Sequence, residues 1–282
     1  MEIGVSTASL FMREYNEDAL PLLDKSDARV VEVFLQGFSE YKKEFGELLK
    51  SRLGNLKVHS VHALTLTYET ELFTINERAF TDVKEIFQSV LTTAKLLEAT
   101  CYTMHGRARI KKSVNYDDFV KIGKRLDKLC DIAENYDVNI CLETVEWALY
   151  NAPGYFKKVK EYAPRLKGTL DIKQCRLSGF DYRDYIADMG ENIKTVHLSD
   201  VDENGKIKLP GKGNFDFETL FRRLKDSGSD PNALIEVYKD DYGDINEIKN
   251  SLDYLREIVY KRQQIRSILC PKGIKTKIGK IL

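Results

Sequence analysis

Ionisable side chains interrupt the short apolar runs of this sequence, each at or near the point where its run ends. The residues concerned are Glu32, His62, His105, Glu143, Asp171, His197 and Glu236. Buried carboxylates and imidazoles cannot stay charged in apolar surroundings without compensation, and a divalent cation is the simplest counter-charge. Oxygen ligands with one imidazole suit Mn²⁺, Mg²⁺ or Zn²⁺, so the pattern predicts a metal centre.

Four of these residues end four successive apolar runs, and we expect them to bind one metal ion together. They are Glu143, Asp171, His197 and Glu236. Taken alone, a glutamate at a strand end is often part of a salt bridge, and a histidine is more often a hydrogen-bonded core residue. That explanation weakens when the four ligand types follow one another. Glu143 and Glu236 are also the candidate catalytic acid and base.

The other histidines are expected to play different parts. His62 and His105 also stand at the ends of apolar runs, and we expect them to bind a second metal or to contact the substrate. His59 lies three residues before His62, so in a regular strand its side chain points to the opposite face. We therefore expect His59 to face the helical layer as a structural residue.

Polar and aromatic residues just after the predicted ligands are candidates for substrate contacts. Glu146 and Lys173 could orient a substrate, and Trp147 could stack on its apolar face. For each of them the alternative is a loop residue that packs locally. Lys212, in the segment PGKG, could contact a phosphate or carboxylate, although an exposed surface lysine is the simpler explanation.

The elements that must position these residues alternate regularly along the chain. Eight β-branched, apolar runs predict strands at 2–8, 29–35, 56–63, 100–105, 138–143, 166–171, 193–198 and 233–237. Between them lie segments with helical periodicity, among them 76–97, 116–136 and a helix after Phe215 that Asp216 is placed to cap.

This alternation favours an α/β fold, a single (β/α)8 TIM barrel. The chain has 282 residues, which suits one barrel of roughly 250 residues. A doubly wound open sheet is the alternative, but it would normally carry a glycine-rich phosphate loop after the first strand. The segment STASLFMREYN, where the first strand ends, contains no such loop. Catalytic groups of a barrel lie at the carboxyl ends of its strands, which is where the ionisable residues stand.

Composition argues against several classes of protein. The 44 basic and 44 acidic residues give no net charge, so nucleic acid is not an expected partner, because phosphate neutralisation supplies most of such affinity. No basic segment followed by a long apolar run marks a signal peptide, and no run approaches the roughly 18 residues of a membrane span. The five cysteines are widely and irregularly spaced, which indicates free thiols and a cytoplasmic protein. Assembly into a homo-oligomer is an open alternative to a monomer.

The end of the chain differs from the rest. Residues 1–260 complete the barrel, and residues 261–282, KRQQIRSILCPKGIKTKIGKIL, contain no acidic residue. We expect a solvated, accessory, basic tail. A contact with another subunit or with an anionic partner is the alternative.

Seven segments in order give the chain a family resemblance. They are VHALTL, MHGR, CLETVEW, TLDIKQ, VHLSD, LPGKGNFDFETLF and IEVY. With these segments the chain resembles the xylose isomerase-like TIM barrel superfamily, which contains sugar phosphate isomerases and epimerases and also endonuclease IV-type abasic-site nucleases. The resemblance extends from Glu2 to about Tyr260.

The resemblance implies a role for each predicted ligand. The core metal of the family is held by residues that match Glu143, Asp171, His197 and Glu236. In the ketose 3-epimerases of this group the two glutamates also transfer protons to and from the carbon beside the carbonyl. In the nuclease branch, histidines that match His62 and His105 bind a further metal, which the strand-five glutamate bridges.

The chain also departs from the family pattern at specific places. Gln174 stands where the nuclease has a ligand of its third metal and where ketohexose epimerases have a histidine that contacts the substrate. The following loop DENGKIKLPGKGN contains no histidine, so we do not expect a third metal. The epimerase branch also has an arginine shortly after the histidine that matches His197. No arginine is present in the corresponding segment of this chain, SDVDENGK.

The sequence therefore favours a metal-dependent isomerase or epimerase that acts on a sugar or sugar derivative. The expected partner is a small-molecule sugar. In this interpretation Glu146, Trp147, Lys173 and Gln174 bind the substrate, and the metal acidifies the C–H bond beside a chelated carbonyl. One alternative is a zinc-dependent nuclease of the endonuclease IV type. Another is a non-catalytic sugar-binding barrel.

Overall fold

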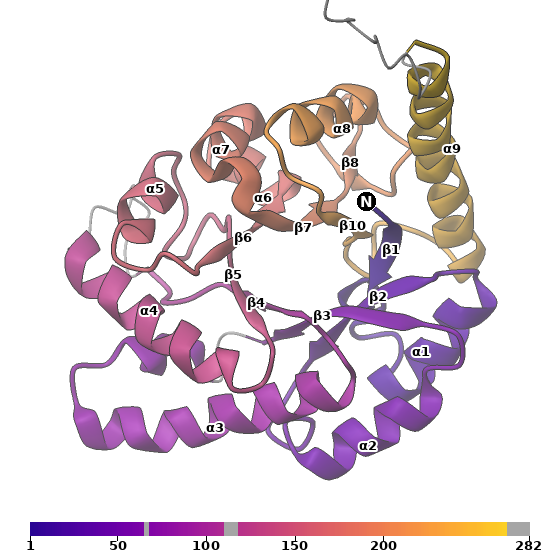
Figure 1. Cartoon of the computed structure of the whole chain (residues 1–282). Helices are drawn as coiled ribbons and strands as arrows, with labels where there is room; N and C mark the ends of the chain where they lie inside the picture. The colour runs from indigo at the N-terminus through magenta and orange to yellow at the C-terminus, as the bar shows by residue number, and fades with distance from the viewer. Residues whose placement is uncertain (65–67, 110–117, 270–282) are drawn as a thin grey trace, which may run out of the picture.

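The strands of the chain close into a barrel with helices around it (Figure 1). The computed structural model describes residues 1–64, 68–109 and 118–269. All neighbouring strands of the barrel pair in parallel, and β1 pairs with both β2 and β10 to complete the ring. The prediction of a (β/α)8 barrel is confirmed.

Each barrel strand overlaps one of the eight apolar runs found in the sequence. They are β1 (Ile3–Ser6), β2 (Val30–Leu35), β3 (Lys57–Ala63), β4 (Cys101–Met104), β5 (Asn139–Glu143), β6 (Lys167–Asp171), β7 (Ile193–Leu198) and β10 (Asn232–Ile235). Parallel strands buried on both faces are expected to be continuously apolar and β-branched, which is how these runs read. In the ring, β7 lies between β10 and β6, and β5 follows β6.

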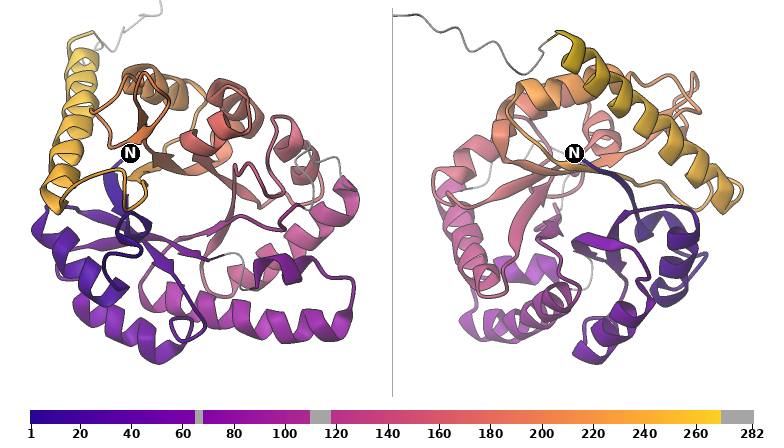
Figure 2. Two further views of the ribbon diagram at one scale, coloured as in Figure 1. Left: turned by 180° about the vertical axis from the view of Figure 1, so that it is seen from behind. Right: turned by 45° about the vertical axis from the view of Figure 1, so that its right-hand side comes forward.

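Helices cover the outside of the strands (Figures 1 and 2). The α-helices are α1 (Asn16–Lys25), α2 (Lys43–Arg52), α3 (Glu77–Leu96), α4 (Phe119–Glu134), α5 (Tyr155–Lys160), α6 (Ile172–Leu177), α7 (Tyr182–Met189), α8 (Phe217–Asp226) and α9 (Ile245–Leu269). Short 3₁₀ turns are η1 (Thr7–Leu10), η3 (Glu69–Phe73) and η4 (Gly190–Asn192).

Side-chain caps mark where the three predicted helices begin. Asn76 caps α3, Asp118 caps α4, and the Asp216 carboxylate accepts a hydrogen bond from the Thr219 amide at the start of α8. Such caps satisfy amide groups that have no partner within the helix. The prediction for Asp216 is confirmed, and the first two residues of the predicted 116–136 segment lie outside the described residues.

A small hairpin and a pinned loop follow β7. The hairpin pairs β8 (Asp200–Val201) with β9 (Ile207–Lys208). The Asp200 carboxylate then accepts hydrogen bonds from the amides of Gly211, Gly213 and Phe215 at 2.9 to 3.0 Å. Three amide donors on one carboxylate hold the loop against the barrel. Lys212 is exposed on this loop.

A bulge in β3 changes where His59 points. Val31 pairs with Val58, but the next residue, Glu32, pairs with Ser60, so His59 is the extra residue. The His59 ring then reaches across the barrel to Thr195 Oγ1 on the opposite strand β7, at 2.9 Å. The prediction that His59 faces the helical layer was wrong, because it assumed an unbroken alternation and a bulge resets that alternation.

The C-terminal helix lies on the outside of the barrel. In Figures 1 and 2, α9 runs past β1 and beside α8, and both elements contact it. The helix continues through Tyr260, where the accessory tail was predicted to start. The rest of that tail, 270–282, lies outside the described residues, and so does Cys270.

Two further sequence expectations concern cysteines and membranes. Cys101, Cys130, Cys141 and Cys175 are buried and carry free thiols. Burial accounts for them as small core residues. Within the described part of the chain, no helix is both long enough and apolar enough to cross a bilayer.

Candidate metal centre

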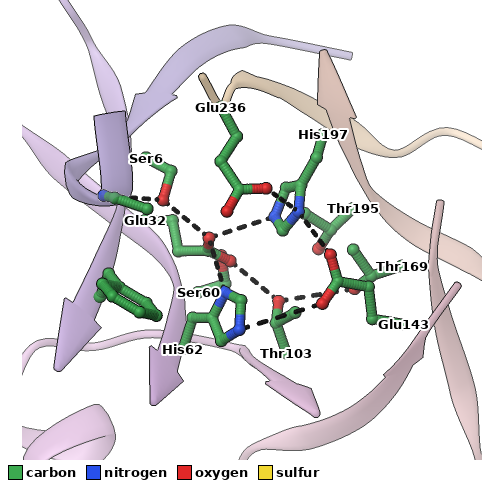
Figure 3. Close-up of polar contacts among 12 residues, drawn as sticks. Ser6, Glu32, Ser60, His62, Thr103, Glu143, Thr169, Thr195, His197 and Glu236 are labelled. Atoms are coloured by element: carbon green, nitrogen blue, oxygen red, sulfur yellow. Dashed lines mark hydrogen bonds and ion pairs between the residues drawn. The ribbon is translucent and has the colours of Figure 1, made fainter. Parts of the chain in front are cut away.

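Four predicted ligands meet at the carboxyl ends of strands β5, β6, β7 and β10. Glu143 and Asp171 are the last residues of β5 and β6, His197 is the last but one of β7, and Glu236 follows β10. One ligand atom from each of the four lies within 4.8 Å of all the others. We call these four residues the acidic cluster, and Figure 3 shows three of them facing one another.

A single imidazole nitrogen faces all three carboxylates of the acidic cluster. His197 Nδ1 lies 2.7 Å from Glu236 Oε2 and 2.9 Å from Glu143 Oε1. Asp171 Oδ2 is 3.9 Å from the same nitrogen. Glu143 Oε2 and Glu236 Oε2 are buried, and their polar contacts are with ring nitrogens, His105 Nε2 at 3.2 Å and His197 Nδ1 at 2.7 Å. Buried carboxylate oxygens that converge on one imidazole nitrogen are the donor set that a divalent cation fits.

The pKa values of this cluster are shifted from their usual values, upward for Asp171 and His197 and downward for Glu236. Burial, with Glu236 and Glu143 nearby, raises the pKa of Asp171 to about 7, although Lys173 opposes the rise. Burial alone would also raise the pKa of Glu236, but His197 and Lys173 hold it well below its usual range. Burial disfavours the charged His197 ring, yet the surrounding carboxylates raise its pKa above its usual value. A cation would relieve the repulsion that these shifts reflect.

His62 and His105 form a second group beside the acidic cluster, which we call the histidine pair. His62 Nε2 lies 3.0 Å from His105 Nε2, and His105 Nε2 lies 3.2 Å from Glu143 Oε2. The two rings and Glu143 bring their ligand atoms within 4.8 Å of one another. Glu143 is therefore shared between the histidine pair and the acidic cluster, which is the arrangement expected for a bridging ligand.

The two members of the histidine pair differ in pKa. Burial lowers the pKa of His105 well below its usual value, and the neighbouring His62 adds to this effect. Burial also opposes the charged form of His62, but Glu32, with Glu143 and Glu236, raises its pKa to about 9. In the absence of metal, one ring of the pair is therefore charged and the other neutral near neutral pH.

Glu32 is a site residue to which the sequence assigned no role. It is fully buried in β2, below the level of the acidic cluster. Although burial opposes its charge, His197 and His62 hold its pKa well below the usual range. The only signal in the sequence was a single acid inside the apolar run VVEVFL.

Glu69 was missed by the sequence analysis altogether. It lies in η3, is fully buried, and accepts hydrogen bonds from the Tyr102 hydroxyl and the Gly106 amide. His105 Nδ1 is 3.8 Å from Glu69 Oε2. Burial raises the pKa of Glu69 to about 7, although Tyr102 holds it down in part. No strand ends at Glu69, so the strand-end rule could not find it.

Lys173 and Gln174 stand beside the acidic cluster on α6. Lys173 is almost fully buried, with its ammonium 3.7 Å from Asp171 Oδ2 and 4.2 Å from the centre of the Tyr238 ring. The Gln174 amide donates to Asp171 Oδ1 at 2.9 Å. Gln174 Oε1 accepts from the Glu146 amide at 3.2 Å, so the side chain of Gln174 ties two loops together.

Glu146 and Trp147 border the histidine pair. The Trp147 ring lies 5.1 Å from the His105 ring, measured between centroids. The Glu146 carboxylate is half-buried and lies 3.8 Å from the Arg109 guanidinium. Trp147 is thus next to a predicted ligand, and Glu146 is joined to Gln174 and Arg109.

Comparisons with known proteins agree on the fold. A family model described as a xylose isomerase-like TIM barrel matches residues 14–258. A solved D-tagatose 3-epimerase-like protein is 19% identical, with a TM-score of 0.74 over 93% of this chain and 100% of that chain. D-Psicose 3-epimerase from Clostridium cellulolyticum H10, solved with D-tagatose, is 16% identical, with a TM-score of 0.75 over 92% of this chain and 99% of that chain.

A third similar structure contains a metal. The IOLI protein with a bound zinc atom is 18% identical, with a TM-score of 0.73 over 93% of this chain and 99% of that chain. Among curated proteins, no sequence matches. At these low identities the solved structures establish the shared fold, and the chemistry must be argued from this chain's own residues.

Proposed function

Because the chain belongs to the xylose isomerase-like TIM barrel family, we propose that it is a metal-dependent isomerase or epimerase of a sugar or sugar derivative. The observation that carries the proposal is the placement of Glu143 and Glu236. These two carboxylates approach His197 Nδ1 from strands on either side of β7, Glu143 at 2.9 Å and Glu236 at 2.7 Å. That is the arrangement needed for two proton-transfer groups around one reacting carbon.

The acidic cluster would hold a divalent cation of the Mn²⁺, Mg²⁺ or Zn²⁺ type. Glu143, Asp171, His197 and Glu236 supply oxygen atoms and one imidazole nitrogen. When bound, such a cation polarises a carbonyl and so acidifies the C–H bond beside it. The similar structure with a bound zinc atom supports metal binding on this fold.

Glu143 and Glu236 would exchange protons with the substrate. One carboxylate removes the proton from the carbon beside the carbonyl, and the other returns a proton from the opposite side, which inverts that carbon. His197 and Lys173 lower the pKa of Glu236 against burial, so this carboxylate is ionised before the reaction, and the same low pKa makes it a weak base in the metal-free protein. For an isomerase the same pair would move the proton between neighbouring carbons.

The substrate itself is proposed to be a small polyhydroxylated molecule. Lys173 presents a charged donor above Asp171, and Trp147 presents an aromatic face beside His105. Glu146 and Gln174 add hydrogen-bonding groups to the same rim. Donors, acceptors and an aromatic face around a cation suit a sugar with a carbonyl group.

A second function, abasic-site cleavage, is favoured by one observation. His62, His105 and Glu143 bring three ligand atoms close together, so they could bind a second metal next to the first. Two neighbouring metal ions are typical of enzymes that hydrolyse phosphoesters. The zero net charge of the chain weighs against this alternative, because it offers little general attraction for DNA.

Exchange of hydrogen with solvent tests the proposal even when the product is not identified. The metal-loaded protein is incubated in D₂O with ketoses, sugar phosphates and keto-glycosides, and deuterium beside the carbonyl is followed by NMR. We expect incorporation into at least one compound, and its loss on chelation and in Glu236→Gln. Cleavage of a duplex with one abasic site, without any exchange, would favour the nuclease instead. Sugar binding without metal or turnover would favour a non-catalytic barrel.

A further inference from the structure

A buried carboxylate lies below the acidic cluster, inside the barrel. Glu32 accepts hydrogen bonds from three hydroxyls on three different strands: Ser6 at 2.9 Å, Ser60 at 2.7 Å and Thr103 at 2.8 Å (Figure 3). The Ser6 oxygen itself accepts a hydrogen bond from the Ala8 amide, so its proton is free to point at Glu32. Glu32 is therefore surrounded by donors, which is the environment of an ionised carboxylate.

Two histidines approach the same oxygen of Glu32 with different ring nitrogens. His197 Nε2 lies 3.1 Å from Glu32 Oε1, and His62 Nδ1 lies 3.5 Å from it. Both nitrogens are buried and have no hydrogen bond of regular geometry to Glu32 or to any other group, so the Glu32 carboxylate is the polar contact that they have. The opposite nitrogens of the two rings face upward, His197 Nδ1 toward Glu143 and Glu236 and His62 Nε2 toward His105. The two rings are thus turned in opposite senses around one carboxylate.

We propose that Glu32 is a positioning residue that orients both metal-facing histidines at once. An ionised carboxylate only accepts hydrogen bonds, so each ring nitrogen that faces it carries the proton. With a metal in the acidic cluster, His197 is then protonated on Nε2, and its Nδ1 lone pair is available to the metal. Without metal, Nδ1 faces the carboxylates of Glu236 and Glu143 at 2.7 and 2.9 Å and carries a proton as well. His62 is protonated on Nδ1 with its Nε2 lone pair toward the histidine pair. A carboxylate behind a ligating histidine fixes its tautomer and orientation in this way.

A different use of the same residues would be a metal between Glu32, His62 and His197. Their ligand atoms lie close enough for this. However, both oxygens of Glu32 already accept hydroxyl protons from Ser6, Ser60 and Thr103, and a metal there would compete with these hydrogen bonds. The hydroxyl donors therefore favour a carboxylate that serves the histidines rather than one that binds metal.

The proposal joins the two halves of the site through one residue. Glu32 contacts the imidazole of the acidic cluster and one imidazole of the histidine pair. Replacing it should disturb both places, although it touches neither substrate nor metal. The inference rests on the metal binding proposed above, and it does not depend on which substrate is used.

The proton positions can be read directly in the unmodified protein. The chain has four histidines, so ¹⁵N–¹H correlation spectra of the imidazoles are simple to assign with His59→Asn and His105→Asn variants. In metal-free protein and with Zn²⁺ bound, we expect a proton on the nitrogen of each ring that faces Glu32, which is Nε2 of His197 and Nδ1 of His62. With Zn²⁺ bound, the proton on His197 Nε2 should persist. Absence of a proton on His62 Nδ1 or on His197 Nε2, with or without zinc, would overturn the proposal.

Metal affinity gives a second readout that needs no substrate. Glu32→Gln keeps the shape of the side chain but offers an amide in place of a second acceptor oxygen. We expect its affinity for Zn²⁺, measured by calorimetry, to fall about 10- to 100-fold. Glu40→Gln is the matched control, because Glu40 is also buried near the end of β2 but accepts from Asn16 and the Gln36 amide instead of a histidine.

The outcomes separate this proposal from the proposed function. Unchanged zinc affinity and unchanged tautomers in Glu32→Gln would refute the positioning role. If that variant does not fold, the tautomers of the unmodified protein decide. If no sugar exchanges hydrogen but the tautomers and the affinity loss are as expected, the proposed function fails while the role of Glu32 stands.

Discussion

The acidic cluster and the histidine pair meet at Glu143, yet they deal with buried charge in different ways. In the acidic cluster three carboxylates converge on the single nitrogen Nδ1 of His197, and crowding and burial raise the pKa of Asp171 to about 7. In the histidine pair each ring has a buried acid behind it, Glu32 behind His62 and Glu69 behind His105.

The difference indicates which half of the site depends on a cation. The acidic cluster has more carboxylates than positive partners, since three carboxylates, those of Glu143, Asp171 and Glu236, surround His197 and Lys173. The histidine pair can balance its charge with protons and acids of the protein itself. We therefore expect the acidic cluster to bind a cation tightly and the histidine pair to bind one weakly.

The largest effect should come from Asp171→Asn, which weakens the acidic cluster alone. Groups that merely support a metal ligand are typically worth about 10- to 100-fold in metal affinity, so loss of a ligand carboxylate itself should cost at least about 100-fold, and turnover should fall with it. The metal-free variant should at the same time be more stable than the metal-free parent above pH 7. The reason is that burial raises the pKa of Asp171 to about 7, so a charged Asp171 is disfavoured in the fold at higher pH.

Calorimetry measures the predicted loss of metal affinity, and urea unfolding at pH 8 measures the predicted gain in stability of the metal-free variant. His59→Asn is the control, since His59 lies at the other end of the barrel beside Thr195. An Asp171→Asn protein that kept full metal affinity would show that the acidic cluster does not hold the ion. A loss of stability at pH 8 would show that Asp171 is better compensated than its surroundings indicate.

A smaller effect is expected when the histidine pair is removed. In the double variant His62→Ala/His105→Ala, the acidic cluster keeps its four ligands, so one metal per chain should remain bound. Turnover should fall by about tenfold to 100-fold, the usual range for groups around a metal ligand. Elemental analysis and the deuterium-exchange rate are the measurements. Loss of all metal would contradict the distinction between the two halves.

Much of this site could be predicted from the sequence because parallel strands of a barrel end at one rim. Glu143, Asp171, His197 and Glu236 each terminate an apolar run, and the structure brings them together for that reason. The eight runs were also enough to predict the barrel, since buried parallel strands are nearly pure in apolar residues.

The rest of the site depends on contacts between distant parts of the chain, which the order of residues in one segment does not reveal. His59 enters the barrel because of a bulge between neighbouring strands, which no periodicity in β3 indicates. Glu32 lies in the interior of its strand, and its importance arises from hydroxyls on three other strands. Glu69 reaches His105 from a 3₁₀ turn after β3, where the chain folds back over the site.

The smallest effect on turnover is expected from Glu69→Gln, whose clearest consequence is a change in the pH dependence of stability. Burial raises the pKa of Glu69 to about 7 in the fold, whereas the unfolded chain releases this proton near pH 4.3. Between these values the folded state binds more protons, so this group's contribution to the free energy of unfolding falls as pH rises. The slope is at most about 1.4 kcal/mol per pH unit, and it should be absent in Glu69→Gln.

Tyr102→Phe is a second test on the same carboxylate. It leaves Glu69 in place and raises its pKa further, whereas Glu69→Gln removes the titrating group. The Tyr102 hydroxyl donates to Glu69 and so lowers its pKa. Without that hydroxyl the pKa of Glu69 should rise further, and the pH window in which stability falls should extend upward. Urea unfolding of the three metal-free proteins from pH 4 to 9 measures both changes. Equal slopes in all three would mean that Glu69 is ionised in the fold, and that His105, like the ligands of the acidic cluster, faces a buried negative charge.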